Sequence, residues 1–142
     1  VKILNREITR LFPSDTEVIA EPGRFIVATA AWLVSEIVGK ARRNGKMFYY
    51  INDGVYHTYS AVVYDHWNPN FTSFRPGQRE LCAVVGPTCD SFDKITSSVE
   101  LPSDLEIGEF LLTQNIGAYS TASSTKFNGF DGAKIFHRNF RA

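Results

Sequence analysis

The chain has 142 residues, of which 44% are apolar, and it carries 15 basic and 15 acidic side chains. This length suits one domain with a buried core, and the composition excludes a disordered segment. The charge balance excludes a strong attraction for nucleic acid or an anionic membrane, and no apolar run reaches the roughly 18 residues that a membrane span needs.

A helix and a short strand are the first elements that the sequence predicts. Residues 3–12, ILNREITRLF, place apolar side chains at helical spacing, and Pro13 ends the helix. The apolar run within TEVIAEPGR, residues 16–24, predicts a buried strand that leads into a glycine turn. Such a fragment of α/β architecture needs further strands beside it. We therefore expect residues 1–31 to be the end of an incomplete α/β domain.

The pattern then changes to short β-prone segments that continue to the end of the chain. Asn44-Gly45 suits a tight hairpin turn between the first two of them. Several strands at this spacing predict a mainly β domain over residues 32–142, a mostly antiparallel barrel or sandwich. The strands are predicted within residues 32–42, 46–53, 60–66, 79–86, 108–115 and 133–139.

The chain has two cysteines, Cys82 and Cys89. Cys82 lies in a predicted strand, and one pair is far from a disulfide framework, so we expect reduced thiols and a cytoplasmic protein. The N-terminus is charged too often for a secretion signal, so the sequon at residues 70–72 is not expected to carry a glycan. Cys89 follows a predicted strand and stands beside Asp90. It is either a small core thiol or a reactive group.

Four short segments concentrate chemically active side chains: EPGR at 21–24, YDH at 64–66, GPTCD at 86–90 and GAY at 117–119. Each alone has an ordinary structural explanation, such as a turn with a surface ion pair or close packing at a glycine. Together and in this order, with YYINDGVY and FNGF, they resemble the pyridoxal-phosphate-dependent decarboxylases of basic amino acids. The resemblance is to the ornithine decarboxylase and lysine/ornithine decarboxylase type, and it extends over nearly the whole chain.

The resemblance implies a two-domain enzyme of which this chain is the C-terminal portion. In the family, a (β/α)8 barrel carries the cofactor, and a β-barrel domain like that of alanine racemase completes the active site across a homodimer. Residues 1–31 would be the end of the first domain, and residues 32–142 the second. The lysine that binds the cofactor covalently lies further upstream in the family, and none of the six lysines here has its context. We therefore expect this polypeptide alone to be inactive.

The resemblance also implies which residues bind pyridoxal 5'-phosphate. Glu21 would hold a proton on the ring nitrogen, and the following Pro22 and Gly23 would shape the turn. Arg24 would bind the phosphate, for which a planar guanidinium is well suited. Tyr119 would reach the same phosphate through its hydroxyl group. No metal site is expected.

The remaining site residues are implied to act on the substrate. Cys89 would donate a proton once carbon dioxide has left, and a thiol with an ordinary pKa of roughly 8.5 is mostly protonated near neutral pH. Asp65, beside Tyr64, and Asp90 would bind the second ammonium group, with the two carboxylates coming from different subunits. Phe127 would line the substrate pocket, although a simple core aromatic explains it nearly as well.

The expected function is decarboxylation of ornithine and/or lysine to putrescine or cadaverine, for polyamine synthesis. The two carboxylates favour a bare ammonium over the carboxylate of diaminopimelate. Ornithine and lysine differ by one methylene, which is worth only about 1–3 kcal/mol in a pocket, so the sequence does not rank them, and arginine is a third option. The alternative is a catalytically inactive relative that binds a protein regulator of polyamine synthesis.

Overall fold

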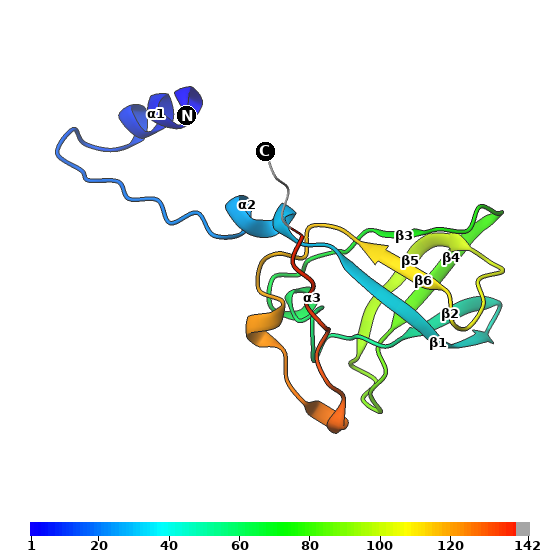
Figure 1. Ribbon diagram of the computed structural model, residues 1–142. Coiled ribbons are helices and arrows are strands. Elements are labelled where there is room, and N and C mark those ends of the chain that lie inside the picture. The colour runs from blue at the N-terminus through cyan, green and yellow to red at the C-terminus, as the bar shows by residue number, and fades with distance from the viewer. Residues whose placement is uncertain (139–142) are drawn as a thin grey trace.

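A computed structural model describes residues 1–138, and a six-stranded sheet that curls into a nearly closed barrel dominates it (Figure 1). Among the described residues, four of the five neighbouring strand pairs are antiparallel, and β2 and β4 are parallel. The order across the sheet is β3-β6-β1-β2-β4-β5. The predicted mostly antiparallel barrel is thereby confirmed. The strands are β1 (Leu33–Arg43), β2 (Lys46–Ile51), β3 (Phe71–Ser73), β4 (Arg79–Val85), β5 (Lys94–Pro102) and β6 (Phe110–Thr113).

One helix of ten residues stands at the N-terminus, and the other described helical segments have three or four residues each. The predicted N-terminal helix is confirmed as α1 (Lys2–Leu11), which stands apart from the barrel and buries none of its residues (Figure 1). No helix in residues 1–138 is long and apolar enough to cross a membrane. The other helical segments are α2 (Arg24–Val27), α3 (Ala61–Tyr64) and the 3-10 turns η1 (Ala28–Ala30), η2 (Thr121–Ser123) and η3 (Phe127–Gly129).

The predicted hairpin turn between β1 and β2 is confirmed. Asn44 and Gly45 have φ values of 51° and 78°, as a tight turn of this kind requires. Arg43 pairs with Lys46 across the turn. The turn sequence therefore sets the register in which β1 and β2 pair next to the turn.

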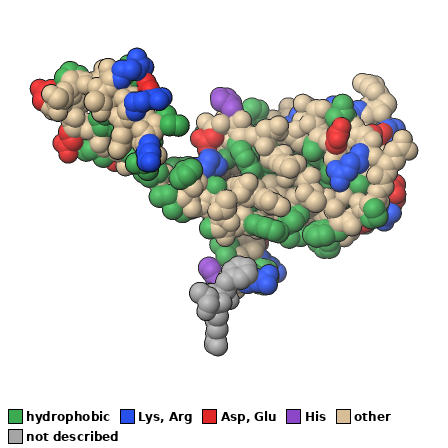
Figure 2. Space-filling model, turned by 90° about the horizontal axis from the view of Figure 1, so that it is seen from above, with side chains coloured by type: hydrophobic (Ala, Val, Ile, Leu, Met, Phe, Trp, Pro, Cys, Tyr) green, Lys and Arg blue, Asp and Glu red, His purple; other side chains and the backbone are tan. Residues whose placement is uncertain are grey.

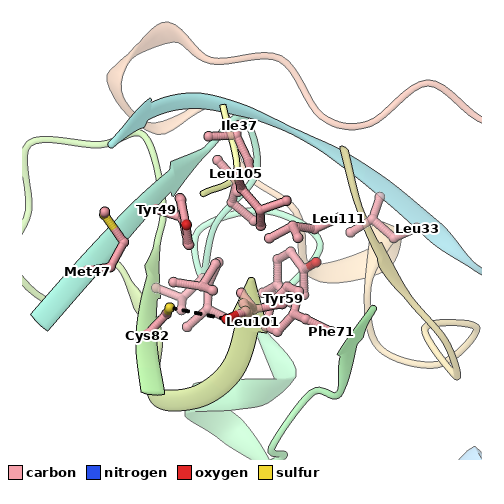
Figure 3. Close-up of a cluster of buried hydrophobic side chains, with 14 of the residues drawn as sticks. Leu33, Ile37, Met47, Tyr49, Tyr59, Phe71, Cys82, Leu101, Leu105 and Leu111 are labelled. Carbon is pink, nitrogen blue, oxygen red and sulfur yellow. Dashed lines mark hydrogen bonds between the residues drawn. The ribbon is translucent and has the colours of Figure 1, made fainter. Parts of the chain in front are cut away.

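The core fills the inside of the curled sheet. Met47, Tyr49 and Ile51 alternate along β2 with half-buried residues, which is the period of a strand with one face inward. The Tyr49 hydroxyl donates to the carbonyl of Pro102 at 2.8 Å, and burial raises the pKa of Tyr49 to about 12, so it stays protonated. Figure 3 shows Tyr49 and Cys82 within this core, where the Cys82 thiol donates to the Leu101 carbonyl. Cys82 is therefore a packing residue.

Three of the predicted strands are wrong. Residues 16–20 form an exposed connection in which Ile19 is 75% exposed, because the described residues offer it no neighbouring strand. The segment 60–66 contains α3 instead, since an apolar run of four residues is equally compatible with one helical turn. Residues 133–138 form no strand, and Asn139, the end of that predicted segment, lies outside the described residues.

Two strands escaped prediction. β3 has only three residues, and its partner β6 lies far along the chain. β5, KITSSVELP, has consecutive exposed polar residues in its middle and lacks a clear alternation. Pairing with β4, rather than an intrinsic pattern, therefore defines β5.

We predict that Leu101→Ala destabilises the chain by about 2–5 kcal/mol, because the side chain is fully buried and its removal leaves a cavity. Leu81 on the neighbouring β4 is 57% exposed, so Leu81→Ala is a matched control with a much smaller effect. Denaturant unfolding of the three proteins measures the difference. Equal losses for the two variants would contradict the assignment of the core.

Candidate active site

The first cluster of candidate residues joins three segments that are far apart in sequence. Arg24 begins α2, and its guanidinium forms an ion pair with Asp65, which directly follows α3. The same guanidinium lies over the ring of Tyr119, with 5.1 Å from Cζ to the ring centroid. The side chains of Arg24 and Asp65 are partly exposed, so their ion pair adds little to stability and remains accessible to a ligand.

Close backbone contacts hold this cluster together. A Cβ atom on Gly23 would lie 2.9 Å from the Tyr119 hydroxyl oxygen, so a side chain at this position would displace the Tyr119 ring. Gly117 fits equally tightly: its N–H donates to the Ala28 carbonyl at 2.9 Å, and a Cβ would overlap the Val27 carbonyl. The glycines of EPGR and GAY thus let the two motifs meet.

Tyr119 itself is held in an uncommon backbone conformation. Its φ is +52°, in the left-handed region that non-glycine residues seldom adopt. The hydroxyls of Ser60 and Ser123 donate to its carbonyl at 3.1 and 3.0 Å. These bonds support a strained conformation that leaves the phenol side chain more than half exposed, at 57%.

The second cluster lies on the loop between β4 and β5, which carries GPTCDSFD. Cys89 is exposed, and its N–H donates to the side-chain oxygen of Asn128 at 3.1 Å. The carboxylate of Asp90 accepts bonds from the Tyr56 hydroxyl and from the Phe92 N–H. The structure therefore excludes Cys89 as a core thiol.

Phe127 belongs to this second cluster. Its ring packs against the ring of Tyr56 with centroids 4.4 Å apart, and it is 40% exposed, so it is not a simple core aromatic. The Tyr56 carbonyl accepts bonds from the N–H and hydroxyl of Thr125, both at 2.9 Å. The segment that carries FNGF is thus anchored to the loop that follows β2.

The bond between Tyr56 and Asp90 favours the ionised form of Asp90 and the protonated form of Tyr56. It lowers the pKa of Asp90, and the Phe92 N–H adds to this effect. It also raises the pKa of Tyr56 to about 12. At neutral pH, Asp90 is therefore a carboxylate and Tyr56 keeps its proton.

A small hollow of about 70 Å³ lies beside both clusters. Tyr64 reaches it from α3, but this side chain is 76% exposed. Glu21 and Pro22 lie on the exposed connection that precedes α2. The hollow is lined by Val55, Tyr56, Ser60, Val63, Tyr64, Phe92, Ser123 and Thr125.

The contacts divide the predicted site residues into two groups. Gly23, Arg24, Asp65 and Tyr119 form one, and the loop with Cys89 forms the other together with Phe127.

Sequence reasoning missed several residues that shape the site. Tyr56 and Asn128 lie within the motifs YYINDGVY and FNGF, yet nothing in their residue types or spacing indicates that they contact the site. Their roles depend on contacts across 34 and 39 residues of chain. Asp93, at the end of GPTCDSFD, stands between Phe92 and Lys94, so nothing in the local pattern predicts that it is only 3% exposed.

The first cluster fits the phosphate of a pyridoxal cofactor. A guanidinium with free donors, a phenol hydroxyl and a glycine that permits close backbone approach converge there. These are the groups that bind phosphate monoesters through short charge-assisted hydrogen bonds. The donor set thus supports a phosphate group at this position.

The family model for the C-terminal sheet domain of pyridoxal-dependent decarboxylases matches residues 24–117. The chain belongs to this family. The lysine/ornithine decarboxylase of Selenomonas ruminantium is 36% identical to it, over 92% of this chain and 33% of the relative. Antizyme inhibitor 2 of Xenopus laevis is 34% identical, over 99% of this chain and 34% of the relative.

A solved structure of the same family has the same fold as this chain. The lysine/ornithine decarboxylase of Vibrio vulnificus, in its complex with cadaverine, superposes with a TM-score of 0.78 at 37% identity, over 92% of this chain and 35% of the other. The chain thus spans about a third of the length of the relatives it matches.

We predict that Tyr56→Phe raises the pKa of Asp90 toward the ordinary aspartate value of about 4, because the largest cause of its lowering is removed. The stabilising contribution of this bond is complete above that value and is lost as the pH falls through the lowered pKa. Carboxyl carbon shifts of Asp90 in NMR titrations of both proteins measure the change. Identical titrations would show that the Tyr56 hydroxyl does not act on Asp90.

Proposed function

We propose that the chain is the C-terminal part of a pyridoxal-phosphate-dependent decarboxylase that acts on ornithine and/or lysine, giving putrescine or cadaverine for polyamine synthesis. The observation that carries this proposal is the exposed Cys89 beside the half-buried Asp90 on an anchored loop. A proton donor and a carboxylate for the substrate ammonium are the two groups that this reaction requires from the domain. The names of the relatives agree with this substrate class.

We place residues 1–31 at the end of a cofactor-binding barrel and residues 32–142 in the β-domain of a cytoplasmic homodimer. Figure 2 shows hydrophobic side chains on the surface where the N-terminal connection joins the barrel. Phe25 and Ile26 on α2 are 93% and 62% exposed. Burying them against a further domain would be favourable, which supports this arrangement.

The residues of the first cluster would hold the cofactor. Bound pyridoxal phosphate supplies a ring that accepts the electron pair left when the substrate loses carbon dioxide. Arg24 and Tyr119 would donate to the phosphate, and Gly23 would let it approach the backbone. Glu21 would retain the proton on the ring nitrogen by electrostatic attraction. This chain alone would be inactive, because the covalent lysine belongs to the upstream barrel.

The residues of the second cluster would complete the reaction in the other subunit's site. The Cys89 thiol donates its proton to the substrate carbon that has lost its carboxylate, and the exposed thiolate recovers a proton from solvent. Asp90 would pair with the distal ammonium together with Asp65 of the other subunit's first cluster, since burial of the ammonium without counter-charges would be costly. Phe127 and Tyr64 line the space for the substrate's methylene groups.

We predict that Cys89→Ala lowers kcat of the full-length enzyme by about 10²- to 10⁴-fold, the usual range for loss of a general acid. Steady-state assays with ornithine, lysine and arginine, with identification of the amine product, measure this effect and rank the substrates. Cys82→Ala removes the other thiol, which is buried in the core, and should leave kcat near the wild-type value. Unchanged turnover and product in Cys89→Ala would remove the acid role.

The same variant tests the shared sites. Cys89→Ala subunits mixed with subunits that lack the cofactor-binding lysine should regain part of the activity, because hybrid dimers contain one complete site. No recovery despite demonstrated subunit exchange would contradict sharing between subunits.

We predict that Arg24→Ala weakens the affinity for pyridoxal phosphate at least tenfold, because a charge-assisted hydrogen bond to the phosphate is lost. Arg42→Ala is the matched control, since Arg42 pairs with Glu80 near the β1–β2 hairpin. Cofactor titration followed by absorbance measures both affinities. Equal affinities in the two variants would argue against Arg24 as a phosphate ligand.

The second candidate function is that of an inactive relative that binds a protein regulator of polyamine synthesis. The similarity to antizyme inhibitor 2 supports it. The presence of Glu21, Arg24, Cys89, Asp90 and Tyr119 favours the enzyme, since a protein that does not catalyse has no need for this set. A full-length protein that binds the cofactor poorly and turns over no basic amino acid would decide for the alternative.

A further inference from the structure

Asp93 is a buried carboxylate at the junction of the two loops that build the second cluster. It is 3% exposed, and it lies between the connection that follows β2 and the loop that follows β4. One of its oxygens accepts the N–H of Val55 at 2.8 Å, and the other accepts the N–H of Thr88 at 3.1 Å. A single side chain therefore ties both loops together.

The two residues whose N–H groups bind Asp93 directly precede Tyr56 and Cys89 in the sequence. Val55 precedes Tyr56, which binds Asp90, and Thr88 precedes Cys89. The backbone of Asp93 also binds the loop that follows β4. Its N–H donates to the Asp90 carbonyl at 3.0 Å, and its carbonyl accepts the Gly86 N–H at 2.8 Å.

Two glycines make room for this carboxylate. A Cβ atom on either Gly54 or Gly86 would overlap the carboxylate of Asp93. Neither glycine has a positive φ, so backbone conformation does not require glycine there. The absence of a side chain at these two positions instead serves the fit of the buried carboxylate between the loops.

We propose that Asp93 is a positioning residue of the active site: it fixes the Cys89-Asp90 segment relative to Tyr56 by accepting one backbone N–H from each loop. The functional part of this inference rests on the proposed function. A carboxylate is suited to this role because it offers two acceptor oxygens. The amide of asparagine offers one acceptor, and its NH₂ group would face the other N–H.

The test uses Asp93→Asn and Gly54→Ala in the full-length enzyme. The first removes one of the two acceptors, and the second displaces the carboxylate without removing it. Amide hydrogen exchange in peptides that cover residues 53–58 and 86–93 should rise at least tenfold in both variants. The kcat per bound cofactor should fall about 10- to 100-fold, because small displacements of a catalytic group have effects of this size. The cofactor affinity should stay within threefold, since the first cluster is intact.

Two variants serve as matched controls. Asp104 is an exposed carboxylate that pairs with Arg75, so Asp104→Asn changes the same chemical group away from the site. A Cβ on Gly77 would lie no closer than 3.2 Å to any neighbour, so Gly77→Ala controls for the glycine substitution. Both should match the wild type in exchange at the two segments and in kcat.

Three outcomes would overturn the role of Asp93. One is unchanged exchange at both segments, and another is faster exchange with unchanged kcat per bound cofactor. The third is a loss of activity that merely follows loss of bound cofactor, as general destabilisation produces. If the wild-type protein decarboxylates no basic amino acid, the proposed function fails. The exchange data, with the labelling rate of the exposed Cys89 thiol, would still show whether Asp93 orders the loop.

Discussion

The long strand β1 is shared between two pairings, and the shape of the molecule depends on this division. Its first residues, Leu33–Glu36, pair with β6, and its later part, from Ile37 to Arg43, pairs with β2. The register shifts between Ile37 and Gly39, where the strand passes from one partner to the other. Such an irregularity bends a strand, and here it curls the sheet around its core. The curl brings the segment after β6 back toward the loops that follow β2 and β4.

The candidate site lies on irregular segments, yet buried polar groups hold them in place. Ser60 and Ser123 fix the carbonyl of Tyr119, and Asp93 fixes the backbone beside Tyr56 and Cys89. The exposed groups can therefore meet a ligand while their backbone stays ordered. A rigid barrel with functional residues on its connecting segments is a common solution to this requirement.

The similarity to both decarboxylases and an antizyme inhibitor shows that this fold alone does not determine function. The distinguishing features are a few side chains on the same framework. Arg24 and Tyr119 form a cationic and hydroxyl-bearing surface, whereas Cys89 and Asp90 offer a proton and a negative charge.

The sequence by itself determined the strands whose pattern is local. The β-prone run KMFYYIND and the turn at Asn44-Gly45 predict β2 and its hairpin, because both signals depend only on neighbouring residues. The order of EPGR, YDH, GPTCD and GAY along the chain identified the family, and the resemblance named the candidate residues.

Only the tertiary structure decided the rest. β5 exists because β4 lies beside it, and residues 60–66 contain a helical turn where four apolar residues suited a strand equally well. The same holds for the site, in which Tyr56 reaches Asp90 and Asp93 joins two loops. The bonds of Asp90 with Tyr56 and of Asp93 with Val55 join segments separated by more than thirty residues, and such pairings follow from the curl of the sheet, which no local pattern encodes.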